Sequence, residues 1–320
     1  MKKFTSVKDV ANIYDLVNDA LVLKRNPLGY NEIGKNKTLG LIFLNPSLRT
    51  RLSTQKAAVN LGMDVMVMNI DKEGWALETR DGVIMDGTTV EHIREAAAVM
   101  GQYFDILGLR SFPNLKNREE DYSEDILQKF ITYSGLPVIS LETGTLHPLQ
   151  SLTDLITIEE LKTVKRPKVV LTWAPHVKAL PQAVPNSFAE WMGAAEVDFV
   201  ITHPEGYELD PAYTYGATIT YNQDEALQHA DFIYVKNWSS YHQYGQVLTQ
   251  DPSWLLTNKR LEITNNARVM HCLPVRRDLE LSSEILDGPS SLVIHQAANR
   301  VWAAQTVLKK MLETNYPFAS

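Results

Sequence analysis

The sequence has very little cysteine: among its 320 residues Cys272 stands alone. This excludes an internal disulfide framework and is typical of a reducing compartment. No apolar run approaches the ~18 residues that a membrane span needs. The first residues, MKKFTSVKDVANIYDLV, carry two lysines but lack the apolar stretch of a secretory signal. These absences predict a cytoplasmic protein without a membrane partner.

The chain also lacks a basic cluster, because its net charge is −7 and its Arg and Lys residues are scattered among acids. A nucleic-acid partner would need a local basic patch, so none is expected. No strand is followed by G-x-G-x-x-G or G-x-x-x-x-G-K-[ST], which argues against a nucleotide-binding protein. No His, Cys or Asp cluster has the spacing of a metal site, so no metal is predicted.

What the sequence does contain is a regular alternation of strand-like and helix-like segments. This pattern is typical of parallel sheets that are covered by helices on both faces. The length suits two domains. The apolar, strand-like runs are 38–44, 64–70, 104–110, 137–142, 168–174, 197–202, 231–237 and 267–273. The helix-like stretches include 50–61, 91–102, 123–134, 149–163, 184–194, 224–230 and 296–314.

The segment 147–150 divides this pattern in half, with four predicted strands on either side. Pro148 suits the first position of a helix that would connect two similar α/β domains. We therefore predict domains over 1–147 and 148–297, with a last helix over about 298–320 that packs back on the first domain.

Ligands of open α/β sheets bind beyond the carboxyl ends of the strands, so the residues there are the candidates for a site. After the first strand comes Ser47-Leu48-Arg49-Thr50-Arg51. A helix N-terminus offers unpaired N–H groups, and arginine adds donors that match phosphate geometry, which together predict a phosphate site. The alternative is an ordinary helix, capped by Ser47 or Thr50, with two solvated arginines.

Other strand ends carry further polar residues, namely Arg110, Glu142, His147 and Gln150. A neutral His147 could donate a hydrogen bond to a substrate oxygen, although a histidine here is also common as a cap or surface group. Arg110 could equally be a surface charge. Cys272, in the segment 271–274, has the alternative of being a small buried residue.

Three of these motifs together resemble the aspartate/ornithine transcarbamylase family. They are S-x-R-T-R at 47–51, H-P-x-Q at 147–150 and, typical of the ornithine-type branch, H-C-L-P at 271–274. The resemblance implies two α/β domains that close over small-molecule substrates. It also implies a homotrimer with shared active sites, and a reaction without cofactor or metal.

The resemblance further implies the chemistry, in which a substrate amine attacks the carbonyl carbon of carbamoyl phosphate. Arg110, His147 and Thr50 would stabilise the carbonyl oxygen, and Arg49 would stabilise the phosphate. Cys272 would lie near the amine without acting as a nucleophile. The implied carbamoyl phosphate-binding residues are Ser47, Leu48, Arg49, Thr50, Trp75, Arg110, His147, Gln150, Leu273 and Arg300.

The chain departs from plain ornithine transcarbamylases at Lys236, where the family's Asp and Ser-Met-Gly loop are missing. The positive charge favours an acyl group over a free ammonium on the substrate. The loop at Trp75 resembles that of the N-acylornithine branch, in which this tryptophan reaches a neighbouring subunit's site. The implied acylornithine-binding residues are Glu142, His176, Lys236, Cys272, Leu273, Arg276, Trp75 and Val90.

Val90 separates two possible substrates. Enzymes for N-acetylornithine carry a glutamate at the matching place, which would repel the terminal carboxylate of a succinyl group. Val90 removes this repulsion and favours N-succinyl-L-ornithine, giving N-succinyl-L-citrulline and phosphate in arginine biosynthesis. N-acetylornithine is the alternative substrate, and a carbamoyl phosphate-binding protein without catalytic activity is the alternative of another class.

Overall fold

Residues 1–316 are described by a computed structural model of the chain, in which they form two compact α/β units. Unit 1 comprises Met1–Pro113, Glu119–Leu149 and the chain from Arg300 onward. Unit 2 comprises Asn114–Arg118 and Gln150–Asn299. Of the predicted last helix, 298–320, residues 317–320 lie outside the described part.

Unit 1 contains a five-stranded sheet in the order β1-β7-β6-β2-β3, with every neighbouring pair parallel. The interior strand β2 is almost wholly buried, because helices cover both faces of such a sheet and leave an uninterrupted apolar run. At the edge, β3 alternates between exposed and half-buried residues. The strands are β1 (Lys3–Phe4), β2 (Thr38–Phe43), β3 (Asp64–Asn69), β6 (Ile106–Arg110) and β7 (Val138–Ser140).

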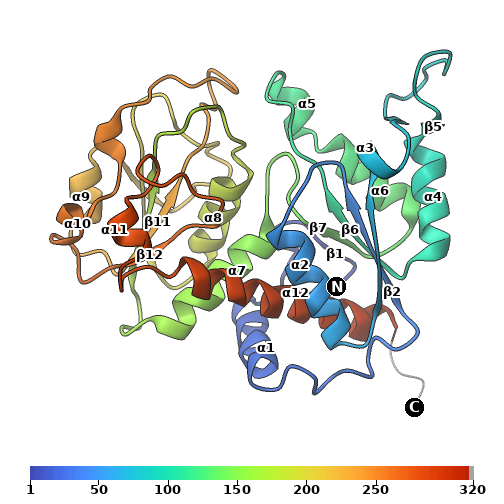
Figure 1. The fold of residues 1–320 in the computed structure, drawn as a ribbon, viewed down its shortest axis with the longest axis horizontal. Coiled ribbons are helices and arrows are strands. Elements are labelled where there is room, and N and C mark those ends of the chain that lie inside the picture. The colour runs from blue at the N-terminus through green and yellow to red at the C-terminus, as the bar shows by residue number, and fades with distance from the viewer. Residues whose placement is uncertain (317–320) are drawn as a thin grey trace. The chain divides into compact units, whose positions relative to one another are not determined.

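Unit 2 repeats this architecture with a second parallel sheet of five strands, in the order β10-β9-β8-β11-β12. Figure 1 shows the sheet and flanking helices of each unit. The strands are β8 (Lys168–Trp173), β9 (Asp198–Thr202), β10 (Thr218–Thr220), β11 (Phe232–Lys236) and β12 (Arg268–Met270).

The helices follow the strands as the alternating pattern predicts. Those of unit 1 are α1 (Ile13–Arg25), α2 (Arg49–Asn60), α3 (Ile70–Glu73), α4 (Ile93–Tyr103) and α6 (Asp125–Ser134). Those of unit 2 are α8 (Ala183–Ala194), α9 (Gln223–Leu227), α10 (Asn258–Leu261) and α11 (Ser283–Leu286). Three helices contain a boundary between units: α5 (Arg118–Tyr122), α7 (Pro148–Leu161) and α12 (Val293–Asn315).

Each unit has its own apolar core, which holds the ends of its strands in place. In unit 1, side chains of the sheet pack with those of α4 and α6, among them Ile42, Leu107, Leu109, Ala97 and Phe130. In unit 2, the core joins the sheet to α9 and α11, among them Val170, Ile233, Val235, Leu227 and Ile285.

The eight strands predicted from apolar runs are present, and the sequence analysis missed the fifth strand of each sheet. β1 has only two residues, and β10 reads TIT with two exposed positions, so neither leaves an apolar run to detect. A small parallel pair, β4 (Leu77–Glu78) with β5 (Glu91–His92), was also missed. None of the helices within residues 1–316 is both long and apolar enough to cross a membrane.

Candidate active site

In unit 1, the predicted phosphate-binding residues lie at the point where the strand order reverses. The chain runs from β2 to β3 on one side, and β6 pairs with β2 on the other. Such a switch point is where open α/β sheets bind ligands. Arg110, the last residue of β6, is paired in register with Phe43, the last residue of β2. Arg110 therefore lies at the same sheet edge as the segment that begins α2.

The start of α2 differs from the prediction that Ser47 or Thr50 caps it. Leu48 is the N-cap residue, and it makes no side-chain cap hydrogen bond. Thr50 is instead buried, and its hydroxyl accepts a hydrogen bond of 2.7 Å from Nη2 of Arg300, a residue of α12. Arg300 is itself buried, so this bond ties α12 to the first turn of α2.

Arg110 is buried rather than solvated, which decides against a surface charge. Its Nη1 lies 2.6 Å from Oε2 of Glu142, in an ion pair whose side chains are 8% and 11% exposed. The same oxygen lies 3.7 Å from Nε2 of His147. The structure thus brings together Arg110, Glu142 and His147, which come from three different parts of the sequence.

His147 is not a surface residue either, since only 3% of it is accessible to solvent. Burial, together with the nearby Arg300 and Arg110 guanidinium groups, holds the pKa of His147 well below its usual value. The imidazole is therefore neutral near pH 7 and keeps one N–H donor. Among the described residues, His147 Nδ1 and Arg110 Nε are buried without a hydrogen-bond partner. Each buried polar atom without a partner requires an explanation, and a ligand that accepts hydrogen bonds at this edge of the sheet would supply one for these two nitrogens.

In unit 2, His176 and Lys236 occupy the equivalent switch point, between β8 and β11. Lys236 is the last residue of β11 and is paired in register with Trp173 at the end of β8. His176 follows β8 within three residues. Lys236 is only 8% exposed and donates to the carbonyl oxygen of Asn237 at 3.1 Å. Lys236 is thus held at the edge where open α/β sheets generally bind ligands.

Arg276 adds a second basic side chain to the group that Lys236 forms with the neutral His176. Its Nε donates to Nε2 of His176 at 3.2 Å. Burial lowers the pKa of His176, and the charges of Lys236 and Arg276 lower it further, so the ring is neutral at pH 7. With Nε2 accepting, Nδ1 is the nitrogen that donates to the carbonyl oxygen of Lys178, at 2.9 Å.

Glu280 was not among the predicted residues, yet it orders this group. Its Oε2 accepts from the backbone N–H of Arg276 at 2.8 Å, and Oε1 lies 3.6 Å from Nε2 of His271. Burial favours the neutral acid, but the nearby His271 ring, the charge of Lys236 and the N–H of Arg276 hold the pKa of Glu280 at about 2. No sequence signal distinguishes this carboxylate, because it lies in an irregular loop.

Gln150 and the segment 271–274 are connected in unit 2 by a buried chain of hydrogen bonds. Asp154 accepts from the side-chain amides of Gln150 and Gln296, each at 2.7 Å, and Gln296 accepts from the backbone N–H of His271 at 2.9 Å. Leu273 then donates its N–H to Nδ1 of His271 at 2.9 Å. Leu273 has a φ of 56°, an unfavourable value for leucine and one found often at functional sites. Cys272 is half-buried in this segment.

Trp75 and Val90 lie just before the two strands of the small β4–β5 pair of unit 1. Trp75 donates from Nε1 to Oε2 of Glu91 at 2.9 Å, and Val90 N–H reaches the carbonyl oxygen of Ala76 at 3.4 Å. Both side chains are largely exposed, Trp75 by 53% and Val90 by 67%.

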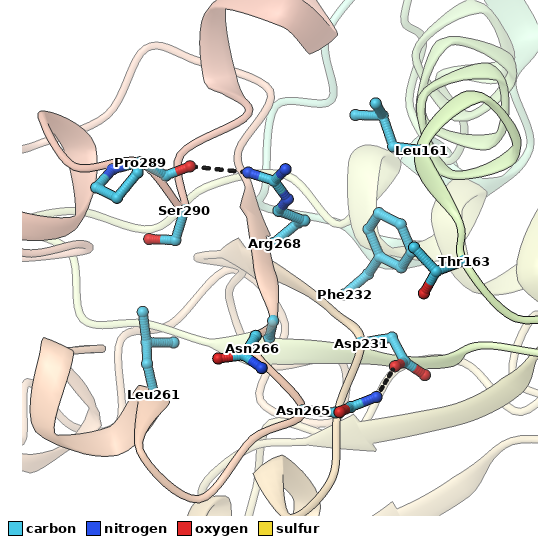
Figure 2. A pocket seen from close by; sticks show the side chains of 11 residues that line it. Leu161, Thr163, Asp231, Phe232, Leu261, Asn265, Asn266, Arg268, Pro289 and Ser290 are labelled. Atoms are coloured by element: carbon cyan, nitrogen blue, oxygen red, sulfur yellow. Dashed lines mark hydrogen bonds between the residues drawn. The ribbon is translucent and has the colours of Figure 1, made fainter.

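A pocket of about 600 Å³ in unit 2 does not coincide with any predicted site residue. Figure 2 shows its lining at the beginnings of β11 and β12, where Arg268 donates to the carbonyl oxygen of Pro289 and Asn265 donates to Asp231. The pocket lies at the amino ends of the strands, opposite the edge that carries Lys236. No group of three potential metal-binding side chains occurs among the described residues.

Sequence comparison matches the chain to one family over most of its length. Residues 2–160 match the family description "Aspartate/ornithine carbamoyltransferase, carbamoyl-P binding domain", and residues 181–311 match "Aspartate/ornithine carbamoyltransferase, Asp/Orn binding domain". N-succinylornithine carbamoyltransferase of Bacteroides fragilis is 55% identical over 315 residues, which cover 98% of this chain and 99% of that protein. N-acetylornithine carbamoyltransferase of Xanthomonas campestris is 32% identical over 342 aligned positions, covering 99% of each chain.

Comparison with solved structures also finds carbamoyl-transferring enzymes that act on acylated ornithine. A variant of N-acetyl-L-ornithine transcarbamylase complexed with PALAO superposes with a TM-score of 0.91 at 32% identity, over 97% of this chain and 100% of that one. Another variant of the same enzyme, in which one glutamate is replaced by valine, is complexed with carbamyl phosphate and N-succinyl-L-norvaline. It superposes with a TM-score of 0.89 at 32% identity, over the same shares of the two chains.

Proposed function

The chain belongs to the aspartate/ornithine carbamoyltransferase family, and from this we propose that it transfers the carbamoyl group of carbamoyl phosphate to the δ-amine of N-succinyl-L-ornithine. The products are N-succinyl-L-citrulline and phosphate, as a step of arginine biosynthesis. The observation that carries the proposal is the buried pair of Arg110 and His147, whose unpartnered nitrogens lie at the strand ends of unit 1.

In the proposed reaction, the neutral amine attacks the carbonyl carbon, and negative charge develops first on the carbonyl oxygen. Arg110 and the neutral ring of His147 donate to this oxygen, with the Thr50 hydroxyl oriented by Arg300 as a third contact. One such donor contributes on the order of 10²–10³ in rate. Glu142 balances the charge of Arg110, so that the buried guanidinium stays in place.

The carbon–oxygen bond to phosphate then breaks, and the phosphate leaves with the charge. Ser47, Leu48 and Arg49 bind the phosphate together with the uncapped N-terminus of α2. Gln150 and Leu273 hold the carbamoyl nitrogen, and each is oriented by the hydrogen-bond chain through Asp154 and His271. The amine loses its proton to solvent or phosphate, and the protein forms no covalent intermediate.

In unit 2, we assign the amine substrate to His176, Lys236, Cys272 and Arg276. Lys236 and Arg276 are cationic, so they attract the carboxylates of an N-acylated amino acid and disfavour a free α-ammonium. The backbone of Cys272 lies next to Leu273 and accepts from the attacking amine.

Val90 favours the succinyl group over the acetyl group in this proposal. A glutamate in its place would repel the terminal carboxylate of succinate. Two comparisons support the choice: the 55% identical relative is an N-succinylornithine carbamoyltransferase, and a relative with glutamate replaced by valine was solved with N-succinyl-L-norvaline.

We further propose a cytoplasmic homotrimer in which Trp75 and Val90 of one subunit enter the site of the next. The apolar surface of unit 1 supports this assembly, because Leu48, Leu52 and Met66 are each more than half exposed. The half-exposed edge strand β3 belongs to the same unit. Mixing inactive Trp75→Ala subunits with inactive Arg49→Ala subunits should restore part of the activity, since some sites then combine intact contributions. Restoration by mixing would not occur if each site were built from one chain.

The deciding experiment incubates the protein with carbamoyl phosphate and, separately, with ornithine, N-acetylornithine and N-succinylornithine. Turnover with N-succinylornithine alone is the expected result. Turnover with N-acetylornithine would retain the mechanism and refute the role of Val90. Turnover with ornithine would refute the role of Lys236. Carbamoyl phosphate binding in calorimetry without any product would establish a binding protein instead of an enzyme.

A further inference from the structure

Glu124 is a carboxylate outside the proposed substrate contacts, and its hydrogen bonds are unusual for its position. It is the N-cap residue of α6, a position where shorter side chains such as aspartate or serine commonly accept a hydrogen bond from their own helix. Glu124 makes no such cap hydrogen bond, and its φ of 53° lies in the left-handed region. This backbone conformation is unfavourable for glutamate, so other contacts must compensate.

Those contacts are with three successive residues of another loop. Oε1 accepts from the Thr143 hydroxyl at 2.9 Å, from Thr145 N–H at 2.7 Å and from the Thr145 hydroxyl at 2.6 Å. Oε2 accepts from Gly144 N–H at 3.1 Å. The backbone donors of Gly144 and Thr145 lie outside any strand or helix, so the carboxylate supplies the partners that they need.

The loop itself is closely fitted to its surroundings. Thr143 N–H donates to the carbonyl oxygen of Leu146 at 3.0 Å, which closes the loop as a turn. A Cβ atom added to Gly144 would lie 2.4 Å from the carbonyl oxygen of Asp121, the residue three positions before Glu124. The loop therefore has contacts to the Glu124 segment through both its donors and its backbone.

The ends of this loop are two residues of the proposed site. Glu142 precedes it, with a φ of 122°, and pairs with Arg110. His147 follows it and carries the buried Nδ1 atom without a partner. Neither residue contacts Glu124 directly in any hydrogen bond of the described chain, so its influence on them passes through residues 143–146.

We propose that Glu124 is a positioning residue for carbamoyl transfer, which holds the loop 143–146 and thereby sets the places of Glu142 and His147. The proposal rests on the proposed function of that site. Its physical basis is that His147 must direct an N–H at one oxygen atom, and a misplacement of about 1 Å can cost on the order of 10² in rate. Four hydrogen bonds to one carboxylate restrict such movement.

The test compares Glu124→Ala, Glu124→Gln and, as a matched control, Glu95→Gln. Glu95 belongs to the same unit, and its side chain is 64% exposed on α4. We expect kcat with N-succinylornithine to fall about 10²-fold in Glu124→Ala, with a much smaller change in KM for that substrate. Glu124→Gln should lose less, about tenfold, because an amide oxygen at the Oε1 position keeps three of the four donors. Glu95→Gln should match the wild type.

A second readout does not depend on turnover. Amide hydrogen exchange at Gly144 and Thr145 should accelerate about tenfold or more in Glu124→Ala, because both N–H groups lose their acceptor. If Glu124→Ala does not fold, Thr145→Val removes a single hydroxyl contact of 2.6 Å and serves in its place. Its effect on kcat should be non-additive with that of Glu124→Gln, since both act on one loop.

The outcomes separate this proposal from the proposed function. Faster exchange with unchanged kcat would overturn the positioning role, as would reduced kcat with unchanged exchange. A wild-type protein that carbamoylates none of the three amines would refute the proposed function and with it the catalytic part of this proposal. Exchange rates would then still decide whether Glu124 holds the loop.

Discussion

Replacing Arg110 by methionine should separate the contribution of this residue to catalysis from its contribution to stability. Arg110 and Glu142 form an ion pair of 2.6 Å with side chains only 8% and 11% exposed. Removing one partner of such a pair leaves a buried charge alone and costs about 3–5 kcal/mol of folding free energy. Loss of a donor to the developing oxyanion costs about 2.7–4 kcal/mol in the barrier, or on the order of 10²–10³ in kcat.

The two losses can be told apart with the double variant Arg110→Met/Glu142→Gln. It removes both charges, so urea denaturation should show that most of the lost stability returns. Steady-state kcat, measured at saturating concentrations of both substrates, should remain reduced by the full 10²–10³. If the double variant instead regains activity to within about tenfold of the wild type, Arg110 acts through stability, and its assignment to the oxyanion is wrong.

Three further outcomes are expected. Arg49→Ala should abolish detectable turnover and carbamoyl phosphate binding in calorimetry, and near-normal activity would mean that the phosphate site is elsewhere. Val90→Glu should shift preference from N-succinylornithine toward N-acetylornithine by about 10-fold or more in kcat/KM, because two juxtaposed carboxylates cost more than about 1.4 kcal/mol, and an unchanged ratio would remove Val90 from specificity. The pKa of His147 is depressed in the folded state, so the unfolded chain binds its proton first as pH falls below about 6.5. Stability should therefore decline from there toward lower pH, and His147→Gln should reduce the slope by about 1.4 kcal/mol per pH unit, measured by urea denaturation at pH 7.5 to 5.

The alternation of apolar runs with helical periods was sufficient to predict the fold class. Parallel strands buried on both faces leave long apolar segments, and β2 and β8 are such strands. The same local rule fails for β1 and β10, because short edge strands depend on pairing with a neighbour rather than on their own composition. Pro148 also predicted the start of a helix correctly, since α7 begins at that residue.

The motifs of the sequence determined which residues form the candidate site, because chemistry requires particular side chains at strand ends. Tertiary structure decided their environment. In the sequence alone, Arg110 cannot be distinguished from an isolated surface charge. The parallel pairing of β6 with β7 is what buries it against Glu142. The alternative in which Ser47 or Thr50 caps α2 was wrong: Leu48 is the N-cap residue, and the Thr50 hydroxyl instead accepts from Arg300, which is 250 positions away in the sequence.

Glu124 and Glu280 show most clearly what the sequence by itself left open. Both are ordinary acidic residues in irregular segments, and no periodicity or motif distinguishes them. Their importance comes from groups that the fold brings to them. Donors of a loop some 20 residues later bind Glu124, and the Arg276 N–H binds Glu280 beside the ring of His271. The sequence determined the strands, the helices and the reactive groups, because these depend on local chemistry. Charge state and orientation depend on burial and on distant partners, so only the tertiary structure decided them.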